Sequence, residues 1–575
     1  MTTNYPRILL WFLLCVTLLL NYQMWVHDYP PPPPTETATH PPAGAGDALD
    51  LAVTKSGKAT PAAGNTAAAP AGAESTAVAP VTGAVAPPAG DDTTLAPAPT
   101  ISVRTDVLDL RISLRGGTLV QADLPKYPKD KGHAEPMRLE NQDGPDSTYV
   151  LQSGIKGPDD AARPTHRALF TSAATEYQLT AGQKELAVPL TWTDGNGVTV
   201  TKTYLFQRGS YRIGLEQDID NQSATAWVGE PYAQIRRNDP PTSSSFFHFS
   251  ADKYASHGPA IWDGKYRKLK ITDTDDRKLS VDVTGGWVAA IQHYFVSAVV
   301  PPTDRSYHFS LGVEGNEYAL AAVGPRITVQ PGSVQKTDFT LFVGPKLQRE
   351  LESTGNQLDR VADYGRLFFI AKPLFWVLDK VHLVLHNWGW TIVFTTLLLK
   401  LALYPLSELS GRSMARMKVL QPRIKAIQES YKDDRQKQSR AVMELYQREK
   451  VNPLSGCLPQ LVQIPIFFAY YWVLLESVEM RQAPFMGWIQ DLSSPDPYYI
   501  LPIIMAGAMF VQYKLNPTSP DPTQARLMLI MPFVLSVTFI FFPSGLVLYW
   551  VTNTLLQIAQ QWNINRRIEA ARKPR

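Results

Sequence analysis

Hydrophobic and polar positions follow different periods in the two halves of the chain. Over residues 101–345, apolar and polar side chains alternate in short stretches that turn residues separate. Alternation of period two places one face of a β-strand inside and the other outside. Over residues 361–562, by contrast, apolar runs are long enough to cross a bilayer. The pattern therefore predicts an all-β domain followed by an α-helical polytopic membrane region.

Two glycine-containing turns predict hairpins in the β region. Leucine and isoleucine alternate with charged residues over 108–115, a glycine pair follows at 116–117, and alternation resumes over 118–124. A second turn, DGNG at 194–197, separates two further stretches of the same kind. Glycine and asparagine adopt the positive φ that tight hairpin turns need. Many short strands with regular turns predict a β-sandwich, in which the apolar run 287–300 is expected to form one long buried strand.

Six apolar segments predict membrane spans. The longest run, 527–562, would extend about 54 Å as a single helix, whereas the hydrocarbon core of a bilayer is about 30 Å thick. Pro543 and Gly545 lie near its middle, so we expect two spans joined by a tight turn. The expected spans are residues 8–26, 388–406, 454–475, 498–515, 527–542 and 545–562.

Basic residues predict the orientation of these spans. The loop 407–452 carries 11 Lys and Arg against 6 Asp and Glu, and the tail 566–575 is also basic. Basic loops stay on the cytoplasmic side of a membrane. No small-residue cleavage site follows the span 8–26, so we expect an uncleaved anchor rather than a signal peptide. Six spans then place both termini inside and the β region outside.

The remaining segments complete the domain plan. Residues 30–100 are rich in proline and alanine and predict a disordered spacer, with binding by the prolines 30–34 as the alternative. An amphipathic helix in the membrane interface, broken at Pro373, is expected before the spans. The loop 407–452 predicts a helical hairpin that turns at 431–434. The expected domains are the anchor 1–29, the linker 30–100, the β-sandwich 101–345, the interfacial region 346–386, the membrane core 387–565 with its cytoplasmic hairpin, and the tail 566–575.

Composition argues against several classes of function. The chain has 55 Lys and Arg, 52 Asp and Glu and a net charge of +3, which gives no electrostatic argument for nucleic-acid binding. Cys15 and Cys457 lie in or beside apolar segments, so no disulfide is expected in the β region. No Gly-x-x-x-x-Gly-Lys-Ser/Thr loop occurs. We expect no cofactor, no metal and no enzymatic activity. The scattered histidines of the β region, expected to be structural, are His248, His257, His293 and His308.

Polar residues recur at helical spacing within the expected spans. A cation inside an apolar span costs roughly 2.5–3.5 kcal/mol on insertion scales, so Lys400 needs an explanation. One interpretation is a hydrophilic chamber shared by three helices. The alternatives are ordinary interhelical hydrogen bonds and, for Lys400, extension of its ammonium to the membrane surface; the residues alone do not decide between them. The polar positions are Thr396, Lys400 and Tyr404, then Gln460 and Gln463 beside Cys457, then Tyr549, Asn553 and Gln557.

Five motifs of the helical region match a known family. They are NPLSGC at 452–457, QIPIF at 463–467, RQAPF at 481–485, DPYYILP at 496–502 and FPSGLVLY at 542–549. In this order, over about 361–561, they resemble the YidC-type membrane protein insertases of the Oxa/YidC family. The β region resembles the large periplasmic domain of the Gram-negative members, by position and strand pattern.

The resemblance implies a fold and a set of site residues. Five core helices would surround a hydrophilic groove that is open to the cytoplasm and lipid and closed to the periplasm. The groove cation, usually an arginine in the family, corresponds to Lys400, which keeps the charge but not the bidentate fork. The groove residues expected from the resemblance and the polar stripes are Thr396, Lys400, Tyr404, Gln463, Tyr549 and Trp550.

The resemblance also implies a function and partners. We expect a membrane protein insertase and chaperone of a Gram-negative inner membrane, which inserts, folds and helps assemble proteins alone or with the Sec translocon. The expected partners are nascent inner-membrane proteins, SecYEG and SecDF, the ribosome and signal recognition particle pathway, and membrane lipids, without specific DNA binding. Two alternatives come from other classes: a transporter or anion channel with Lys400 as its selectivity charge, and an envelope binding protein that works through its β region.

Overall fold

The computed structural model describes residues 98–142, 144, 147–158, 163–239, 257–362, 364–432, 434–449, 458–515 and 522–570. Several expectations from the sequence lie outside the described residues and stay predictions. They concern the anchor 8–26, nearly all of the linker 30–100, Cys15, Cys457, His248, the motif at 452–457 and the end of the tail, 571–575.

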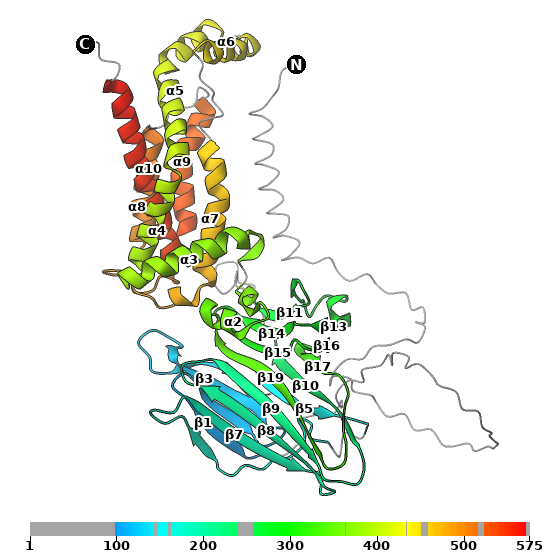
Figure 1. Ribbon diagram of the computed structural model, residues 1–575. Coiled ribbons are helices and arrows are strands. Elements are labelled where there is room, and N and C mark those ends of the chain that lie inside the picture. Colours follow the sequence, from blue (N-terminus) through cyan, green and yellow to red (C-terminus); the bar gives the residue numbers. More distant parts are fainter. Residues whose placement is uncertain are drawn as a thin grey trace, which may run out of the picture. The chain divides into compact units, whose positions relative to one another are not determined.

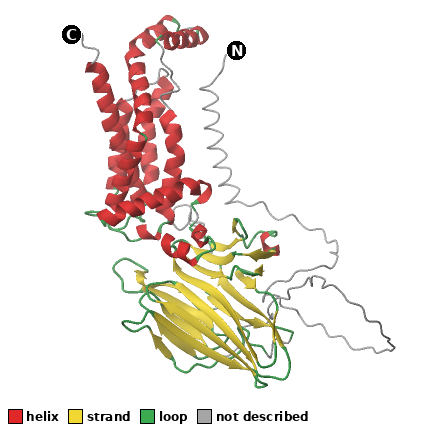
Figure 2. Cartoon of the chain, in the orientation of Figure 1, coloured by secondary structure: helices red, strands yellow, loops and turns green. Residues whose placement is uncertain are grey.

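The amino-terminal part of the described chain is all β, and its strands form two sheets (Figures 1 and 2). The strands are β1 Thr100–Arg104, β2 Asp109–Ser113, β3 Thr118–Pro128, β4 Pro136–Glu140, β5 Tyr149–Lys156, β6 Glu176–Gln178, β7 Glu185–Thr193, β8 Val198–Gln207, β9 Arg212–Asn221, β10 Trp227–Asn238, β11 Gly258–Trp262, β12 Tyr266–Lys268, β13 Ser280–Thr284, β14 Trp287–Gln292, β15 Phe295–Val300, β16 Ser306–Glu314, β17 Glu317–Val323, β18 Ile327–Val329 and β19 Ser333–Pro345.

The first sheet has the strand order β13-β16-β17-β10-β5-β3-β2-β1-β6, with β18 paired to β10 and β4 paired to β3. The second has the order β12-β11-β14-β15-β19-β9-β8-β7. Along β8, buried positions alternate strictly with half-buried ones, as expected for a strand with one face against a core. This region is therefore a β-sandwich, as the alternation predicted.

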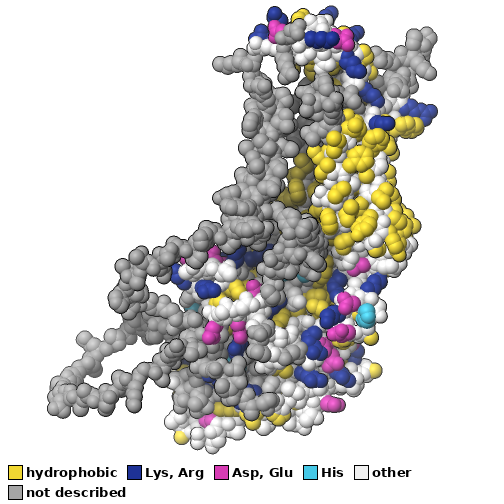
Figure 3. Space-filling view, turned by 180° about the vertical axis from the view of Figure 1, so that it is seen from behind, with side chains coloured by type: hydrophobic (Ala, Val, Ile, Leu, Met, Phe, Trp, Pro, Cys, Tyr) yellow, Lys and Arg dark blue, Asp and Glu magenta, His cyan; other side chains and the backbone are white. Residues whose placement is uncertain are grey.

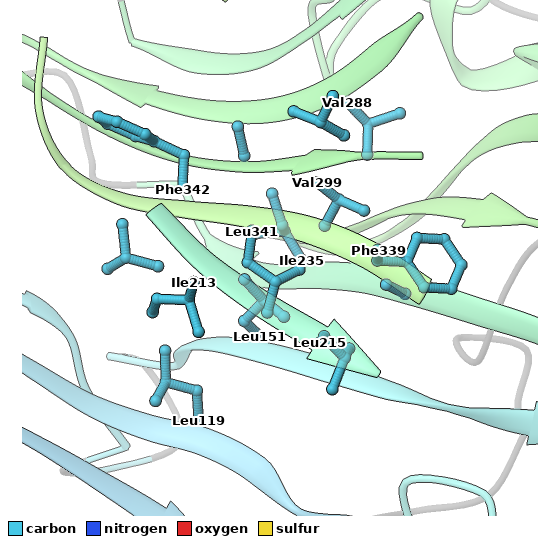
Figure 4. Packing of buried hydrophobic residues seen from close by; sticks show 14 of the residues in the cluster. Leu119, Leu151, Ile213, Leu215, Ile235, Val288, Val299, Phe339, Leu341 and Phe342 are labelled. Carbon is cyan, nitrogen blue, oxygen red and sulfur yellow. The ribbon is translucent and has the colours of Figure 1, made fainter. Parts of the chain in front are cut away.

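Side chains from both sheets fill the space between them (Figure 4). Leu119 and Leu151 come from the first sheet, Ile213 and Leu341 come from the second, and all four are 0 % exposed. Burial of a large aliphatic side chain contributes about 1.5–3 kcal/mol, so this core is large enough to stabilise the sandwich without disulfides.

Both predicted hairpins are confirmed. β2 pairs antiparallel with β3, and the glycines between them, Gly116 and Gly117, have φ of 68° and 62°. β7 pairs with β8 across the second turn, where Gly195 and Gly197 also have positive φ. Only glycine adopts this region without a steric cost from Cβ, which is why these turns were visible in the sequence.

The expectation of one long strand over 287–300 is wrong. The structure has two antiparallel strands, β14 and β15, that pair Gln292 with Phe295 across a turn at His293 and Tyr294. The turn contains no glycine or proline, and both strands are buried on both faces. Without alternation or turn residues, no sequence signal marked the reversal.

The carboxy-terminal part is helical (Figure 2). Short 3₁₀ segments η5 Leu358–Val361, η6 Gly365–Leu367 and η8 Val478–Met480 accompany it, and η4 Asp276–Lys278 lies in the β region. The helices are α2 Gln348–Thr354, α3 Phe368–Leu385, α4 Trp388–Ala402, α5 Tyr404–Ser430, α6 Arg435–Arg448, α7 Leu458–Glu476, α8 Ile500–Leu515, α9 Pro522–Phe539 and α10 Ser544–Ala570.

Two prolines act differently from expectation. Pro373 was expected to break the interfacial helix, but it lies inside the continuous helix α3, and its place in the second turn removes only one backbone hydrogen bond.

Pro405, by contrast, interrupts the segment expected as one span: α4 ends at Ala402, α5 begins at Tyr404, and the two helices are bent by 69°. Proline has no N–H to donate to the preceding turn but is tolerated in the first turn of a helix, and Pro405 lies in the first turn of α5.

One loop covers one end of the helices. We call residues 481–499, between α7 and α8, the cap loop. Its Phe485 carbonyl accepts a hydrogen bond of 3.0 Å from the Asn387 amide, just before α4. Its Ser494 and Leu492 carbonyls accept the first backbone N–H groups of α10, those of Ser544 and Gly545, at 2.7 and 2.9 Å. The cap loop therefore joins the starts of α4 and α10 and satisfies N–H groups that a helix leaves free.

Hydropathy identifies only some of the helices as candidate membrane spans. Among the described residues, no single helix meets the length and hydropathy expected of a membrane span; the bent pair α4 and α5 meets them together, and Val462–Glu476, Ile500–Leu515 and Leu529–Phe539 are apolar but shorter. The number of six spans stays a prediction. Large hydrophobic side chains are nevertheless exposed on these helices, such as Ile503 (68 %) and Val537 (59 %), and Figure 3 shows a broad hydrophobic patch over the helical region.

The end of α7 is tied to residues of the β region by a buried ion pair. Lys346 follows β19 and places its Nζ 2.8 Å from a carboxylate oxygen of Glu476, and both side chains are 0 % exposed. His293 hydrogen-bonds the Leu475 carbonyl at 3.0 Å, and Val478 belongs to the hydrophobic core of the sandwich. α7 is thus anchored at its carboxyl end by charge, hydrogen bonding and apolar packing.

Candidate functional site

A polar pocket lies among the helices where α4, α5, α7 and α10 meet. Apart from its polar groups, it has a wall of leucine and isoleucine side chains. The lining residues are Thr396, Leu399, Lys400, Leu403, Leu406, Ser407, Gln463, Ile466, Tyr549 and Asn553. Four of the six residues predicted from the sequence, Thr396, Lys400, Gln463 and Tyr549, are therefore brought together.

Lys400 supplies the positive charge of the pocket. It lies in the last turn of α4, where the free carbonyl groups of a helix favour a cation. Its Nζ lies 3.4 Å from Oε1 of Gln463 on α7. Within the described residues, Lys400 has a hydrogen bond to Gln463 and no ion pair with a carboxylate. The ammonium is held by an amide dipole and keeps its charge uncompensated.

Gln463 connects this cation to α10. Its amide nitrogen donates to Oδ1 of Asn553 at 2.6 Å, so three helices contribute to one hydrogen-bonded row. Asn553 lines the pocket but is absent from the expected groove set. The sequence indicated Asn553 by its place one turn after Tyr549 on the same polar stripe.

Thr396 and Tyr549 form the inner wall. Thr396 is 1 % exposed, and its hydroxyl donates to the Ile392 carbonyl one turn earlier at 2.6 Å. Tyr549 is 2 % exposed, and its ring stacks on Tyr470 with centroids 4.4 Å apart. Both residues are held by packing, and Lys400 is the charged residue of the pocket lining.

Tyr404 and Trp550 do not line the pocket. Tyr404 was placed on the Lys400 stripe by continuing one helix, but α4 ends before it, so the helical register does not extend across the bend. The bend instead brings in Ser407, which sequence spacing did not indicate. Trp550 packs edge-on against Phe467 with centroids 4.5 Å apart, beside the pocket rather than within it.

The pocket lies away from the capped end. Lys400 follows Trp388, the first residue of α4, by twelve residues, or about 18 Å along a helix axis. On α7, Gln463 precedes the last residue, Glu476, by thirteen residues, which gives a similar distance of about 20 Å.

The arrangement can bind and partly dehydrate an anion, since it offers one cation and several hydrogen-bond donors between apolar walls. The described residues contain no cluster of His, Cys, Asp and Glu able to hold a metal ion.

A second buried lysine lies inside the β-sandwich. Lys202 is 0 % exposed and donates to the Gly116 carbonyl at 2.5 Å and to the carbonyl and hydroxyl of Ser153 at 2.9 and 3.0 Å. Burial lowers the pKa of Lys202 to about 7. Because an ammonium has three donors, this lysine is saturated, and its contacts indicate a structural role.

Two family models match consecutive parts of the chain. The YidC periplasmic domain matches residues 100–377, and the 60Kd inner membrane protein matches residues 380–572. The border between the two matches falls within α3.

Relatives match over most of their length. The membrane protein insertase YidC of Thioalkalivibrio sulfidiphilus is 45 % identical over 584 residues, which cover 99 % of both chains. That of Methylococcus capsulatus is 48 % identical over 471 residues, covering 82 % of this chain and 86 % of the relative. A solved structure described as an active YidC insertase with its first transmembrane domain resolved is 20 % identical with a TM-score of 0.36, covering 81 % of this chain and 94 % of that chain.

Proposed function

Because the chain belongs to the YidC family of membrane protein insertases, we propose that it inserts proteins into the inner membrane of a Gram-negative bacterium, and that the pocket around Lys400 receives a polar segment of the client. The observation that carries the proposal is the uncompensated ammonium of Lys400, held by Gln463 between apolar walls.

The mechanism is a lowering of a desolvation barrier. A polar or acidic segment of a client loses its water on entering the membrane, which is costly unless new partners are present. The ammonium of Lys400 and the hydroxyl and amide groups around it replace part of that water. The adjoining apolar segment of the client then moves into lipid along the exposed hydrophobic helix faces, and the hydrophobic effect drives this step without a nucleotide.

We place the cap loop on the periplasmic side and the pocket in the cytoplasmic half of the membrane. The Lys346–Glu476 ion pair joins the β-sandwich to the capped end of the helices. The basic helices α5 and α6, by contrast, come after the pocket residues of α4 along the chain. This orientation agrees with basic loops remaining inside. Six spans, cytoplasmic termini and the domain borders expected from the sequence are parts of this proposal.

The partners follow from the same proposal. Clients are nascent inner-membrane proteins, and lipids contact the hydrophobic helix faces. Work together with the Sec translocon, and delivery by the ribosome and signal recognition particle pathway, are consistent with a basic cytoplasmic hairpin of α5 and α6. An ion channel would need a continuous pore, and the packing of the cap loop against the starts of α4 and α10 speaks against one in the described residues.

The test is insertion into vesicles that contain the purified protein and no ATP. Two versions of a small client differ by one Asp→Asn substitution in the polar segment. Lys400→Arg is expected to insert both, whereas Lys400→Met and Lys400→Glu are expected to slow the acidic client by about ten-fold or more, the equivalent of one lost charge-assisted contact. Lys514→Met is the matched control, since Lys514 also ends an apolar helix, α8, but lies outside the pocket. Normal insertion of the acidic client by Lys400→Glu would refute the proposal.

A further inference from the structure

The hydrogen-bonded row in the pocket has only one possible direction. A lysine ammonium donates hydrogen bonds and accepts none. Gln463 must therefore turn its amide oxygen toward Lys400, and its NH₂ group then points away. That NH₂ group donates to Asn553 at 2.6 Å. The oxygen of Asn553 is thereby used, and its own NH₂ group remains for another acceptor.

Asn553 supports this direction. A glutamine amide can turn by 180° with little change in shape, because its oxygen and nitrogen are nearly the same size. If the amide of Gln463 turned over, its N–H groups would face the ammonium of Lys400, and donor would oppose donor. The acceptor on Asn553 at 2.6 Å stabilises the other orientation. A residue on α10 thus controls the surroundings of a charge on α4 through a side chain on α7.

We propose that Asn553 is the positioning residue of the anion site: it holds Gln463 with the amide oxygen toward Lys400, and so keeps the ammonium inside the pocket with its remaining donors directed to a client carboxylate. The inference rests on the proposed function and adds to it the residue that fixes the cation. An incoming carboxylate competes with a neutral amide oxygen for Lys400, and an ionised acceptor forms the stronger hydrogen bond. Gln463 therefore holds the ammonium of Lys400 until a client carboxylate takes its place.

A double-mutant cycle in the vesicle assay tests whether Asn553 acts through Gln463. The variants are Asn553→Leu, Gln463→Leu and the pair together, each with the acidic client and its Asp→Asn version. Asn553→Leu is expected to slow the acidic client about ten-fold and to leave the neutral client within about two-fold. In the Gln463→Leu background, Asn553→Leu is expected to have no further effect. Gln557→Leu is the matched control, because Gln557 lies one turn further along α10 and does not line the pocket.

Two results would overturn the inference. Equal losses for both clients would mean that Asn553 only supports the fold, and losses that multiply in the double variant would mean that it acts independently of Gln463. If Asn553→Leu fails to fold, Asn553→Ala decides, because it also removes the acceptor for Gln463. It is expected to slow the acidic client and to leave the neutral client within about two-fold; equal effects on both clients contradict the inference.

The failure of this inference is distinct from the failure of the proposed function. If Lys400→Met inserts the acidic client normally, the proposed function is wrong whatever the Asn553 variants do. If Lys400→Met is defective while the cycle is additive, the pocket works but Asn553 does not position its cation.

Discussion

Two lysines in the same chain, one buried and one half-buried, have opposite surroundings. Lys202 in the β-sandwich has a partner for each of its three N–H groups and is 0 % exposed. Lys400 in the helical region has one hydrogen bond among the described residues, 3.4 Å long, to a neutral amide. A saturated ammonium contributes to one fixed structure, whereas an ammonium with free donors can take a ligand. The two lysines therefore differ in both burial and hydrogen bonding, and the proposed function rests on the free donors of Lys400.

A third lysine, Lys346, is as buried as Lys202 but is paired with a carboxylate. Lys346→Met would leave the charge of Glu476 buried and unpaired, which is expected to destabilise the protein by about 3–5 kcal/mol. Denaturant unfolding of the full chain in detergent measures this. Lys336→Met, on the strand β19 that precedes Lys346, is the control, since Lys336 also pairs with a glutamate, Glu216, but is 52 % exposed; its loss should be below about 1 kcal/mol. Equal effects of the two variants would contradict the assignment of a buried pair.

Replacement of Lys202 should affect stability and spare insertion. Lys202→Ala removes three hydrogen bonds and leaves a cavity beside Ser153, with an expected loss of about 2–4 kcal/mol in the free energy of unfolding of the sandwich. Insertion into vesicles by the folded protein should stay within about two-fold of wild type, the opposite of Lys400→Met. A Lys202→Ala protein that is stable but inactive would contradict a purely structural role for Lys202.

The stability contributed by Lys202 should depend on pH. Burial lowers the pKa of Lys202 to about 7 in the folded protein, against 10.5 for a free lysine. Between these values the unfolded chain binds more protons than the folded chain, so stability rises with pH, by at most about 1.4 kcal/mol per pH unit. Below about pH 7 both states are protonated and the slope vanishes.

Comparison with Lys202→Met isolates this slope from other titrating groups, among them Glu140, whose pKa burial raises to about 8. The stability difference between wild type and Lys202→Met should shift in favour of wild type as the pH rises from about 7 to about 9. A constant difference over this interval would show that Lys202 is charged in the folded core.

The smallest effect is expected at the surface of the α5–α6 hairpin. Arg423 and Glu449 lie 2.6 Å apart, but their side chains are 67 % and 37 % exposed. Exposed ion pairs contribute about 0–1 kcal/mol, so Arg423→Glu should change stability and insertion very little. A large loss of insertion with unchanged folding would instead identify Arg423 as a contact for a partner. It would also show that a charged side chain outside the pocket contributes to insertion.

Local rules predicted much of the β-sandwich and part of the pocket. The hairpin at Gly116 and Gly117 was visible because its turn needs positive φ. The reversal at His293 was not, since flanking strands buried on both faces carry no alternation. In the helices, spacing found Lys400 and Thr396, because residues one turn apart share a face.

Contacts between helices could not be read from spacing. The pairing of Gln463 with Asn553 joins residues on two different helices, and nothing in either segment alone indicates the partner. Tyr404 is lost from the pocket because α4 ends at Ala402 and a new helix begins at Tyr404; the visible signal was Pro405, which has no N–H to donate to the preceding turn.

The most direct test of the account places a photoreactive amino acid at Ser407, inside the pocket, or at Met486, which is 53 % exposed on the cap loop. During insertion of the acidic client into vesicles, the account predicts crosslinks to the client segment from position 407 that weaken with the Asp→Asn client and with Lys400→Met, and few from position 486. Crosslinks from position 407 that ignore both the aspartate and Lys400, or entry of the segment at position 486, would contradict it.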